Sequence, residues 1–142
     1  MRKMRSLTAA LLIIAGMAGC QAAGDGSQSM TRSEVYFGRT RPGGPDVSDA
    51  EFKQFVEREI APRFPQGFTL MPAEGHWREA SGKVVTEPTM LLILFSDTAP
   101  DAAAIEAICH AYREQFGQEA VLKVTSPVRV EFEVAPATRP AH

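Results

Sequence analysis

The pattern of apolar and polar residues predicts two strands in the first half of the chain. Glu34–Gly38 is short and rich in β-forming side chains, which is typical of a strand. A second strand is expected over Phe68–Arg78, broken or bulged at Pro72, because proline cannot donate a hydrogen bond to a neighbouring strand. A turn at Ala80–Gly82 follows, and Lys83–Thr86 runs back from it.

Two later strands differ in how many of their faces are apolar. Met90–Phe95 is a run of six apolar residues, and this length fits a buried strand better than a helix. Alternate side chains of a strand point to opposite faces: Met90, Leu92 and Leu94 to one, Leu91, Ile93 and Phe95 to the other. In the last predicted strand, Val121–Phe132, the even positions are mostly apolar: Leu122, Val124, Val128, Val130 and Phe132. The odd positions are mostly polar, which suits the edge of a sheet.

Two segments have helical periodicity. Ser48 and Glu51 have the spacing of a capping box at the start of the first helix, and Pro62 would help to end it. Thr98–Asp101 opens the second helix, and Gly117 is a natural stop. Each helix has one apolar face: Phe52, Phe55, Val56 and Ile60 in the first, and Ile105, Ile108, Cys109, Tyr112 and Phe116 in the second.

The order of these elements is β-α-β-β-α-β, which predicts an α+β fold of the ferredoxin-like class. Such a fold has a four-stranded antiparallel sheet with two helices on one face, and its first and third strands are central. Because Met90–Phe95 is apolar on both sides, the helix-free side of the sheet must also be covered. The cover could be a second copy of the domain, a ligand, or the hairpin around Trp77. We favour a second copy, which would make a homodimer of the dimeric α+β barrel type.

The first twenty residues have the three blocks of a secretory signal. Basic residues at positions 2, 3 and 5 precede an apolar run, Leu7–Gly16, that is too short for a permanent membrane span. Met17–Cys20 resembles the lipobox of bacterial lipoproteins, although leucine is usual in place of Met17. We therefore expect a lipoprotein signal peptide over 1–19 and acyl chains, such as palmitate, on Cys20. The alternative is an ordinary signal peptide that leaves Cys20 free.

This leader predicts the address and organisation of the chain. The protein would be exported and anchored to a membrane through Cys20, facing the periplasm or the cell exterior. In a Gram-negative cell, Gln21 after the cysteine would favour the outer membrane. The lipidated cysteine and a flexible tether would occupy 20–32, one α+β domain 33–133, and a disordered tail 134–142.

Composition excludes several classes of function. Without residues 1–19 the chain has 12 basic and 17 acidic residues, a formal charge of −5, which disfavours nucleic acid as a partner. Acylation of Cys20 would leave only Cys109, so that neither an intramolecular disulfide nor a zinc site of several cysteines can form. Three scattered histidines do not make a metal site, and no sequence motif for a cofactor is present.

Several short motifs, in their order and spacing, resemble a known family. They are Tyr36-Phe37-Gly38, Pro62-Arg63-Phe64-Pro65 with Gly67 and Thr69, Gly75-x-Trp77, Glu87-Pro88, and Phe116-Gly117-Gln118-Glu119. Together they resemble domain of unknown function 3574, a family of small bacterial exported proteins, over about residues 33–132. The resemblance implies no activity and supplies no catalytic residues.

The candidate binding residues are Tyr36, Arg39, His76, Trp77 and Glu87. His76 could form an acid–base pair with Glu87 or Glu74, because a carboxylate can orient and tune an imidazole near neutral pH. The alternative is a solvated hairpin of mixed charge. Trp77 could stack on a ligand ring or cap the open side of the sheet.

Two further groups have a chemical and a structural interpretation. Tyr36 should point to the helix-free side, and with Arg39 and Arg41 it could bind an anion. Arginines in a loop are more often solvated. Cys109 lies on an apolar helical stripe and is expected to be a packed thiol rather than a reactive one.

The leading functional hypothesis is a non-catalytic, lipid-anchored envelope domain that self-associates or binds a partner protein through the open side of its sheet. The alternative is a small-molecule enzyme or ligand-binding protein. Its pocket would lie at the helix-free side, between sheet and hairpin, lined by Tyr36, His76, Trp77 and Glu87. The sequence identifies no ligand.

Overall fold

The computed structural model describes residues 27–78, 81–97 and 101–133 of the chain. Its elements follow the expected order: β1 (Gln28–Gly38), α1 (Asp49–Phe55), the π-helical segment η1 (Val56–Ile60), β2 (Thr69–Arg78), β3 (Val84–Ser96), α2 (Asp101–Phe116) and β4 (Leu122–Val130). The signal peptide, Cys20 and the C-terminal tail that the sequence predicts lie outside the described residues. Among the described residues no helix is long and apolar enough to cross a bilayer.

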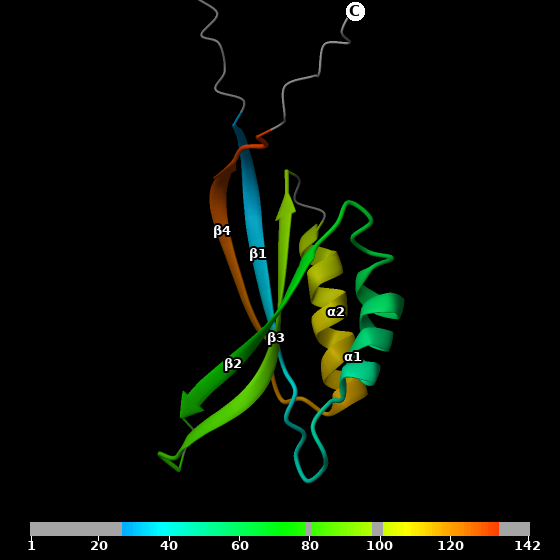
Figure 1. The fold of residues 1–142 in the computed structure, drawn as a ribbon, viewed down its shortest axis with the longest axis vertical. Helices are drawn as coiled ribbons and strands as arrows, with labels where there is room; N and C mark the ends of the chain where they lie inside the picture. Colours follow the sequence, from blue (N-terminus) through cyan, green and yellow to red (C-terminus); the bar gives the residue numbers. More distant parts are fainter. Residues whose placement is uncertain (1–26, 79–80, 98–100, 134–142) are drawn as a thin grey trace, which may run out of the picture.

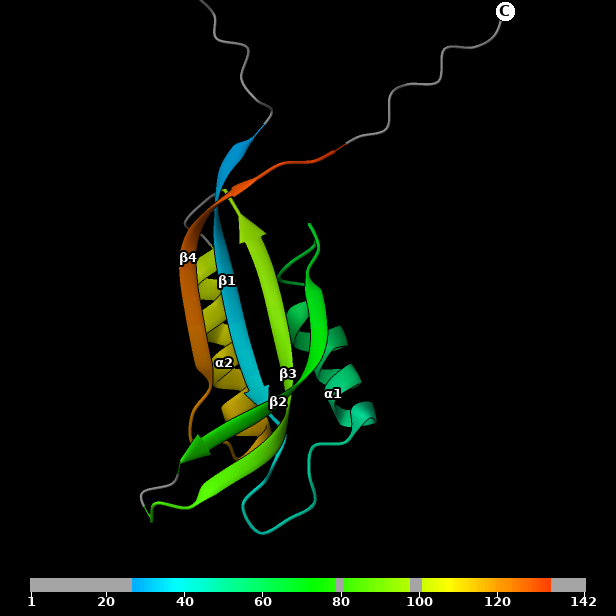
Figure 2. The same cartoon turned by 60° about the vertical axis from the view of Figure 1, so that its left-hand side comes forward.

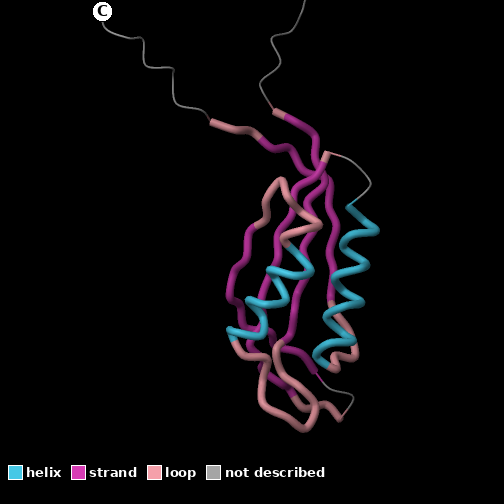
Figure 3. The backbone as a smooth tube through the Cα atoms, turned by 90° about the vertical axis from the view of Figure 1, so that its right-hand side faces the viewer, coloured by secondary structure: helices cyan, strands magenta, loops and turns pink. Residues whose placement is uncertain are grey.

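The four strands form one antiparallel sheet in the order β2-β3-β1-β4. Both helices lie on the same side of this sheet, as Figure 1 shows and the turned view of Figure 3 makes clear. The central strands are β1 and β3, and the half-polar last strand, β4, is at an edge. The ferredoxin-like α+β fold is therefore confirmed.

The core lies between the sheet and the two helices. Val35 and Phe37 of β1 and Leu92 and Leu94 of β3 are buried on this side. They meet the apolar stripe of α2, every residue of which is buried as the periodicity predicts: Ile105, Ile108, Cys109, Tyr112 and Phe116. The aromatic rings are closely packed, with the centroids of Phe37 and Tyr112 4.6 Å apart. Because these side chains of β1 and β3 face the helices, the alternate side chains of both strands lie on the opposite side of the sheet.

The start of α1 has the predicted capping box. The backbone N–H of Glu51 donates to the hydroxyl of Ser48 at 3.3 Å, and the carboxylate of Glu51 accepts from the backbone N–H of Ser48 at 2.9 Å. The last residue of α2 is followed by Gly117 with φ +66°, the left-handed conformation in which glycine ends a helix. The start of α1 and the end of α2 therefore lie where these local sequence signals predicted.

The first strand is longer than the sequence indicated. β1 begins at Gln28, so that residues 28–32, which we expected in a flexible tether, are part of the sheet. Gln28 pairs with Val130 and Ser29 with Arg129 of β4. These pairs join segments about a hundred residues apart, and their backbone hydrogen bonds do not depend on β-forming side chains.

Two prolines do not interrupt their strands. β2 continues through Pro72, where a break or bulge was expected, because β2 is an edge strand and an edge tolerates proline. β3 continues through Pro88, and the carbonyl of Pro88 accepts from the backbone N–H of Arg39 at 2.9 Å, just beyond the end of β1. The nitrogen of Pro88 has no hydrogen to donate, and the carbonyl of Arg39 accepts instead from the backbone N–H of Val47 at 2.7 Å.

Candidate functional site

The side of the sheet away from the helices is mostly apolar. The strand register places its side chains in rows across the sheet. One row holds Met71, Leu91, Tyr36 and Leu122, and the next holds Thr69, Ile93, Glu34 and Val124; beyond them Phe95 lies beside Arg32 and Ser126. We call these residues the helix-free face.

None of the described elements covers the helix-free face. Met71 is 46% exposed, Phe95 48%, Leu122 60% and Val124 41%, although all four are large apolar residues. Figure 2 shows α2 behind the sheet, while β4, β1 and the upper part of β3 lie open to the viewer. The steps of about 3.3 Å along a strand and 4.8 Å between strands give this face roughly 300–400 Å². Apolar patches of this size are often interaction sites.

A short polar stripe on β1 runs through the middle of this face. Nη2 of Arg32 is 2.7 Å from Oε1 of Glu34, and the hydroxyl of Tyr36 donates to Oε2 of the same carboxylate at 2.5 Å. The hydrogen bond to Glu34 raises the pKa of Tyr36 above its usual value, and burial adds to the rise. Tyr36 therefore points to the helix-free side as predicted, and its hydroxyl is held by Glu34.

The hairpin of β2 and β3 carries a second polar group, centred on Glu87. Its carboxylate lies directly over Gly38, where a β-carbon would come within 2.8 Å of both carboxylate oxygens. It accepts hydrogen bonds from the backbone N–H of Thr40 and from the side chain of Trp77. Burial raises the pKa of Glu87 above its usual value, and the charge of Asp46 adds to the rise, while the two hydrogen bonds oppose it. Glu87 thus ties the hairpin to the loop after β1.

His76 lies on the other face of the same hairpin. It pairs with Thr86 in the register, so its side chain and that of Glu87, one residue further on, point to opposite sides. Nε2 of His76 is 2.8 Å from Oε1 of Glu74, and Nδ1 is 3.0 Å from Oγ1 of Thr86. The pairing of His76 with Glu87 is therefore wrong, and the contact with Glu74 is solvent-exposed.

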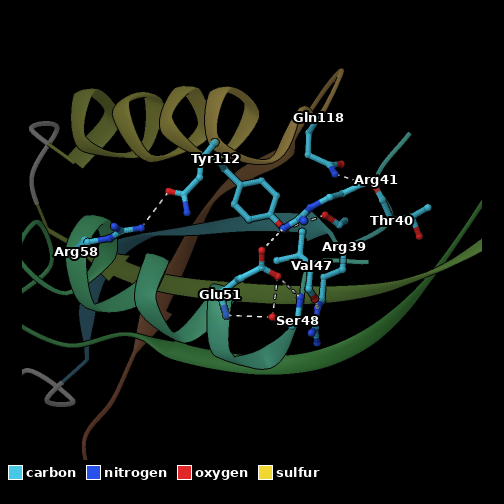
Figure 4. A network of polar contacts seen from close by, with 11 residues as sticks. Arg39, Thr40, Arg41, Val47, Ser48, Glu51, Arg58, Tyr112 and Gln118 are labelled. Atoms are coloured by element: carbon cyan, nitrogen blue, oxygen red, sulfur yellow. Dashed lines mark hydrogen bonds and ion pairs between the residues drawn. The ribbon is translucent and has the colours of Figure 1, made fainter. Parts of the chain in front are cut away.

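The two loop arginines are on the helix side and do not join Tyr36. Nε of Arg39 donates to the carbonyl of Val47 at 2.6 Å, and Nη1 is 2.7 Å from Oδ1 of Asp49. Figure 4 shows Arg41 beside Glu51. Nη2 of Arg41 is 2.7 Å from Oε1 of Glu51, and its guanidinium lies 5.2 Å from the ring centroid of Phe116. The proposed anion site of Tyr36 with Arg39 and Arg41 is therefore wrong, because these arginines anchor the loop to α1 and α2.

Of the predicted binding residues, the structure brings together only Trp77 and Glu87. Sequence reasoning missed Arg32 and Glu34, although the alternation through Val35 and Phe37 places both on the face of Tyr36. It also gave no role to Gly38, whose missing side chain makes room for the carboxylate of Glu87. A signal was available, because the short motifs around positions 38, 77 and 87 are among those that carry the family resemblance.

Among the described residues, neither Cys109 nor a cluster of potential metal ligands makes a candidate site. Cys109 is 6% exposed, and burial raises the pKa of its thiol, so it is a packed side chain as predicted. Within the described ranges no three side chains of histidine, cysteine, aspartate or glutamate are grouped as metal ligands would be. The helix-free face and the Glu87 group therefore remain as candidate sites among the described residues.

Two solved structures, with TM-scores above 0.5, support the fold. A phage SAM lyase in complex with S-methyl-5'-thioadenosine is similar over 75% of this chain and 93% of its own, with a TM-score of 0.53 and 19% identity. The apo form of a phage SAM lyase has a TM-score of 0.51 and 18% identity, covering 75% of this chain and 92% of its own. CutA from Synechococcus elongatus covers 72% of this chain and 80% of its own, with a TM-score of 0.47 and 10% identity.

Comparison of sequences gives the family. No curated protein matches the chain. A family model with the description "Protein of unknown function (DUF3574)" matches residues 32–132, which run from within β1 to just beyond the end of β4 and contain every motif named above. The chain therefore belongs to the DUF3574 family.

Proposed function

We propose that this protein is a non-catalytic, lipid-anchored component of the bacterial envelope that binds another protein surface through its helix-free face. The observation that carries the proposal is the exposure of Phe95, Leu122 and Val124 in adjacent rows on one side of the sheet. Exposed apolar side chains cost free energy in water, and a protein surface that covers them recovers about 25 cal/mol for each Å² buried. Helices bury the other side of the same strands and leave this side free.

The anchor and the fold are compatible. Seven residues separate Cys20 from Gln28, the first residue of β1, and they can span at most about 25 Å. An acylated Cys20 would therefore keep the first end of β1 near the membrane surface. Confinement to a surface raises the effective concentration of partners in the same membrane, so that a modest face could form a stable contact.

The anchor is tested by metabolic labelling with an alkyne analogue of palmitate in a bacterial host that acylates exported cysteines. The full chain should acquire the label and fractionate with membranes, and Cys20→Ser should lose both properties. Cys109→Ser is the matched control, because it removes the other cysteine and should keep the label. A wild-type chain that is exported without label would contradict the anchor.

The face is tested by placing the photoreactive residue benzoylphenylalanine at position 122 of the membrane-anchored chain. Leu122 is exposed on the helix-free face, whereas His110 is exposed on α2 and serves as the control position. Irradiation of cells should give a discrete covalent protein adduct from position 122 and none from position 110. The absence of adduct at position 122 would sink the proposal for the face while leaving the anchor intact.

We propose as a second candidate a small-molecule site at the hairpin. It is supported by Trp77, which is 49% exposed beside the partly buried carboxyl of Glu87 and can offer a ring face to an aromatic ligand. The phage SAM lyase of similar fold holds S-methyl-5'-thioadenosine, which makes that nucleoside a reasonable first probe. Titration should quench the fluorescence of Trp77, the only tryptophan. Isothermal titration calorimetry should show weaker binding by Trp77→Phe, which has no tryptophan fluorescence. An unchanged emission spectrum at millimolar nucleoside would rule out this probe as its ligand.

A further inference from the structure

The charges on the helix-free face are complementary to a copy of themselves. Its centre holds one cation and one anion, Arg32 and Glu34, two residues apart on β1. Phe95 and Ile93 lie beside them on β3, and Ser126 and Val124 on β4. A purely anionic or cationic partner would meet one like charge in this stripe. A surface that presents the same two charges in the reverse direction would meet only opposite ones.

Two sheets that pack face to face through a two-fold axis have two simple arrangements, because the axis must lie in the plane between them. With the axis along the strands, Arg32 would lie over the partner's Arg32, and like charges would meet. With the axis across the strands, β1 crosses the partner's β1 in the opposite direction. At the level of Ser33, which lies between the two charges, this second arrangement puts Arg32 over the partner's Glu34 and the reverse.

We propose that the helix-free face binds a second copy of this chain about such an axis, level with Ser33. This inference rests on the proposed function and names its partner. Each Arg32 then faces the partner's Glu34, and the two pairs within chains and the two between chains make a cluster of four charges. Such a cluster is worth more than isolated surface pairs because each charge has two opposite neighbours.

The same axis brings apolar rows together. Ile93 is level with Glu34 and Phe95 is level with Arg32 in the register of β1 and β3. Reversal about the axis therefore places Phe95 over the partner's Ile93, and Ile93 over the partner's Phe95, next to the four charges. Sheets packed in this way are about 10 Å apart and turned by roughly 30°, a spacing that such side chains fill.

Charge reversal tests the pairing in the mature chain carrying Cys20→Ser, examined by sedimentation velocity. The unaltered face should give dimers. Arg32→Glu and Glu34→Arg should each raise the dimer dissociation constant at least about tenfold, because each places like charges opposite each other twice. An equimolar mixture of the two variants should form heterodimers, since every contact between them is then of opposite charge. If each variant failed to dimerise only because it had lost its own Arg32–Glu34 ion pair, mixing the two variants would not restore association.

Control variants separate the inference from the proposed function. Glu57→Arg makes the same change of charge on the exposed surface of η1 and should leave the dimer unchanged. Phe95→Glu should also dissociate the dimer, and it replaces the charge variants if either fails to give a native circular dichroism spectrum. A monomeric chain, or variants that do not associate when mixed, would overturn the inference. If position 122 then still forms an adduct with a different protein, the proposed function stands with another partner.

Discussion

The carboxylate of Glu87 occupies the space that a side chain at position 38 would need. An ideal β-carbon on Gly38 would come within 2.8 Å of both oxygens of Glu87, closer than real β-carbons approach other atoms. Gly38 is the last residue of β1, and Glu87 belongs to β3, so the contact joins two central strands where the loop toward α1 begins. Glycine at this position thus permits the hydrogen bonds of Glu87 to Thr40 and Trp77.

Gly38→Ala should displace the carboxylate of Glu87 and lower the free energy of unfolding by about 1 kcal/mol. The cost is modest because the end of a glutamate side chain can move, but its hydrogen bonds are then lost. Urea denaturation measures the change in stability. Because Trp77 is the only tryptophan, the shift of its emission also reports loss of the contact.

Gly44→Ala is the matched control for this substitution. A β-carbon on Gly44 would have no atom within 4 Å, and its φ is not in the left-handed region, so the variant should be close to wild type. A double variant, Gly38→Ala with Glu87→Ala, should lose less stability than the two single changes added together. Strict additivity would show that Gly38 matters for a reason other than Glu87.

Glu87→Gln should alter how stability depends on pH. Burial raises the pKa of Glu87 in the folded chain above the usual 4.5, so the folded state binds its proton more tightly than the unfolded state does. Wild-type stability should therefore fall, relative to Glu87→Gln, as the pH rises from 4.5 through the raised pKa. Urea denaturation of both chains between pH 4 and pH 7 measures this difference. A difference independent of pH would contradict the raised pKa.

Tyr112→Phe should destabilise the fold by about 1–2 kcal/mol. The hydroxyl of Tyr112 donates to the carbonyl of Gly38 at 2.9 Å from a fully buried side chain, and phenylalanine leaves that carbonyl without its donor. Tyr36→Phe is the matched control, because its hydroxyl bonds to Glu34 on the helix-free face. Denaturant midpoints should place the variant at position 112 well below that at position 36, and equal losses would contradict the role of burial.

Local patterns predicted the fold because its core depends on local periodicity. The stripe on α2 requires only a repeat of 3.6 residues, and Met90–Phe95 requires only an apolar run between turns. Both predictions are confirmed. The doubly apolar strand also led us to expect a cover on the helix-free side, and that expectation stays a prediction. The start of β1 at Gln28 could not be predicted in this way, because the pairing with β4 joins opposite ends of the domain.

Which of the candidate residues lie together depends on strand register, and the sequence alone does not give that register. His76 and Glu87 are close along the hairpin, but a strand turns alternate side chains to opposite faces, and a shift of one residue reverses the choice. His76 lies opposite Thr86, and this register separates it from Glu87. Tyr36 was placed correctly because Val35 and Phe37 beside it belong to the core. Its expected partners, Arg39 and Arg41, lie beyond the end of β1, where the loop turns them toward the helices.

Glu51 should make the protein more sensitive to acid. Its carboxylate accepts from Arg41 at 2.7 Å and from the hydroxyl and backbone of Ser48, and these hydrogen bonds lower its pKa from 4.5 to about 2. A lowered pKa stabilises the folded state fully above pH 4.5, and this contribution is lost as the pH falls toward 2. Glu51→Gln should therefore be less stable than wild type at neutral pH, and the difference should shrink on acidification through this window. Thermal unfolding from pH 7 to pH 2 measures it, and a gap that stays constant would show that Arg41 and Ser48 do not stabilise the charged form.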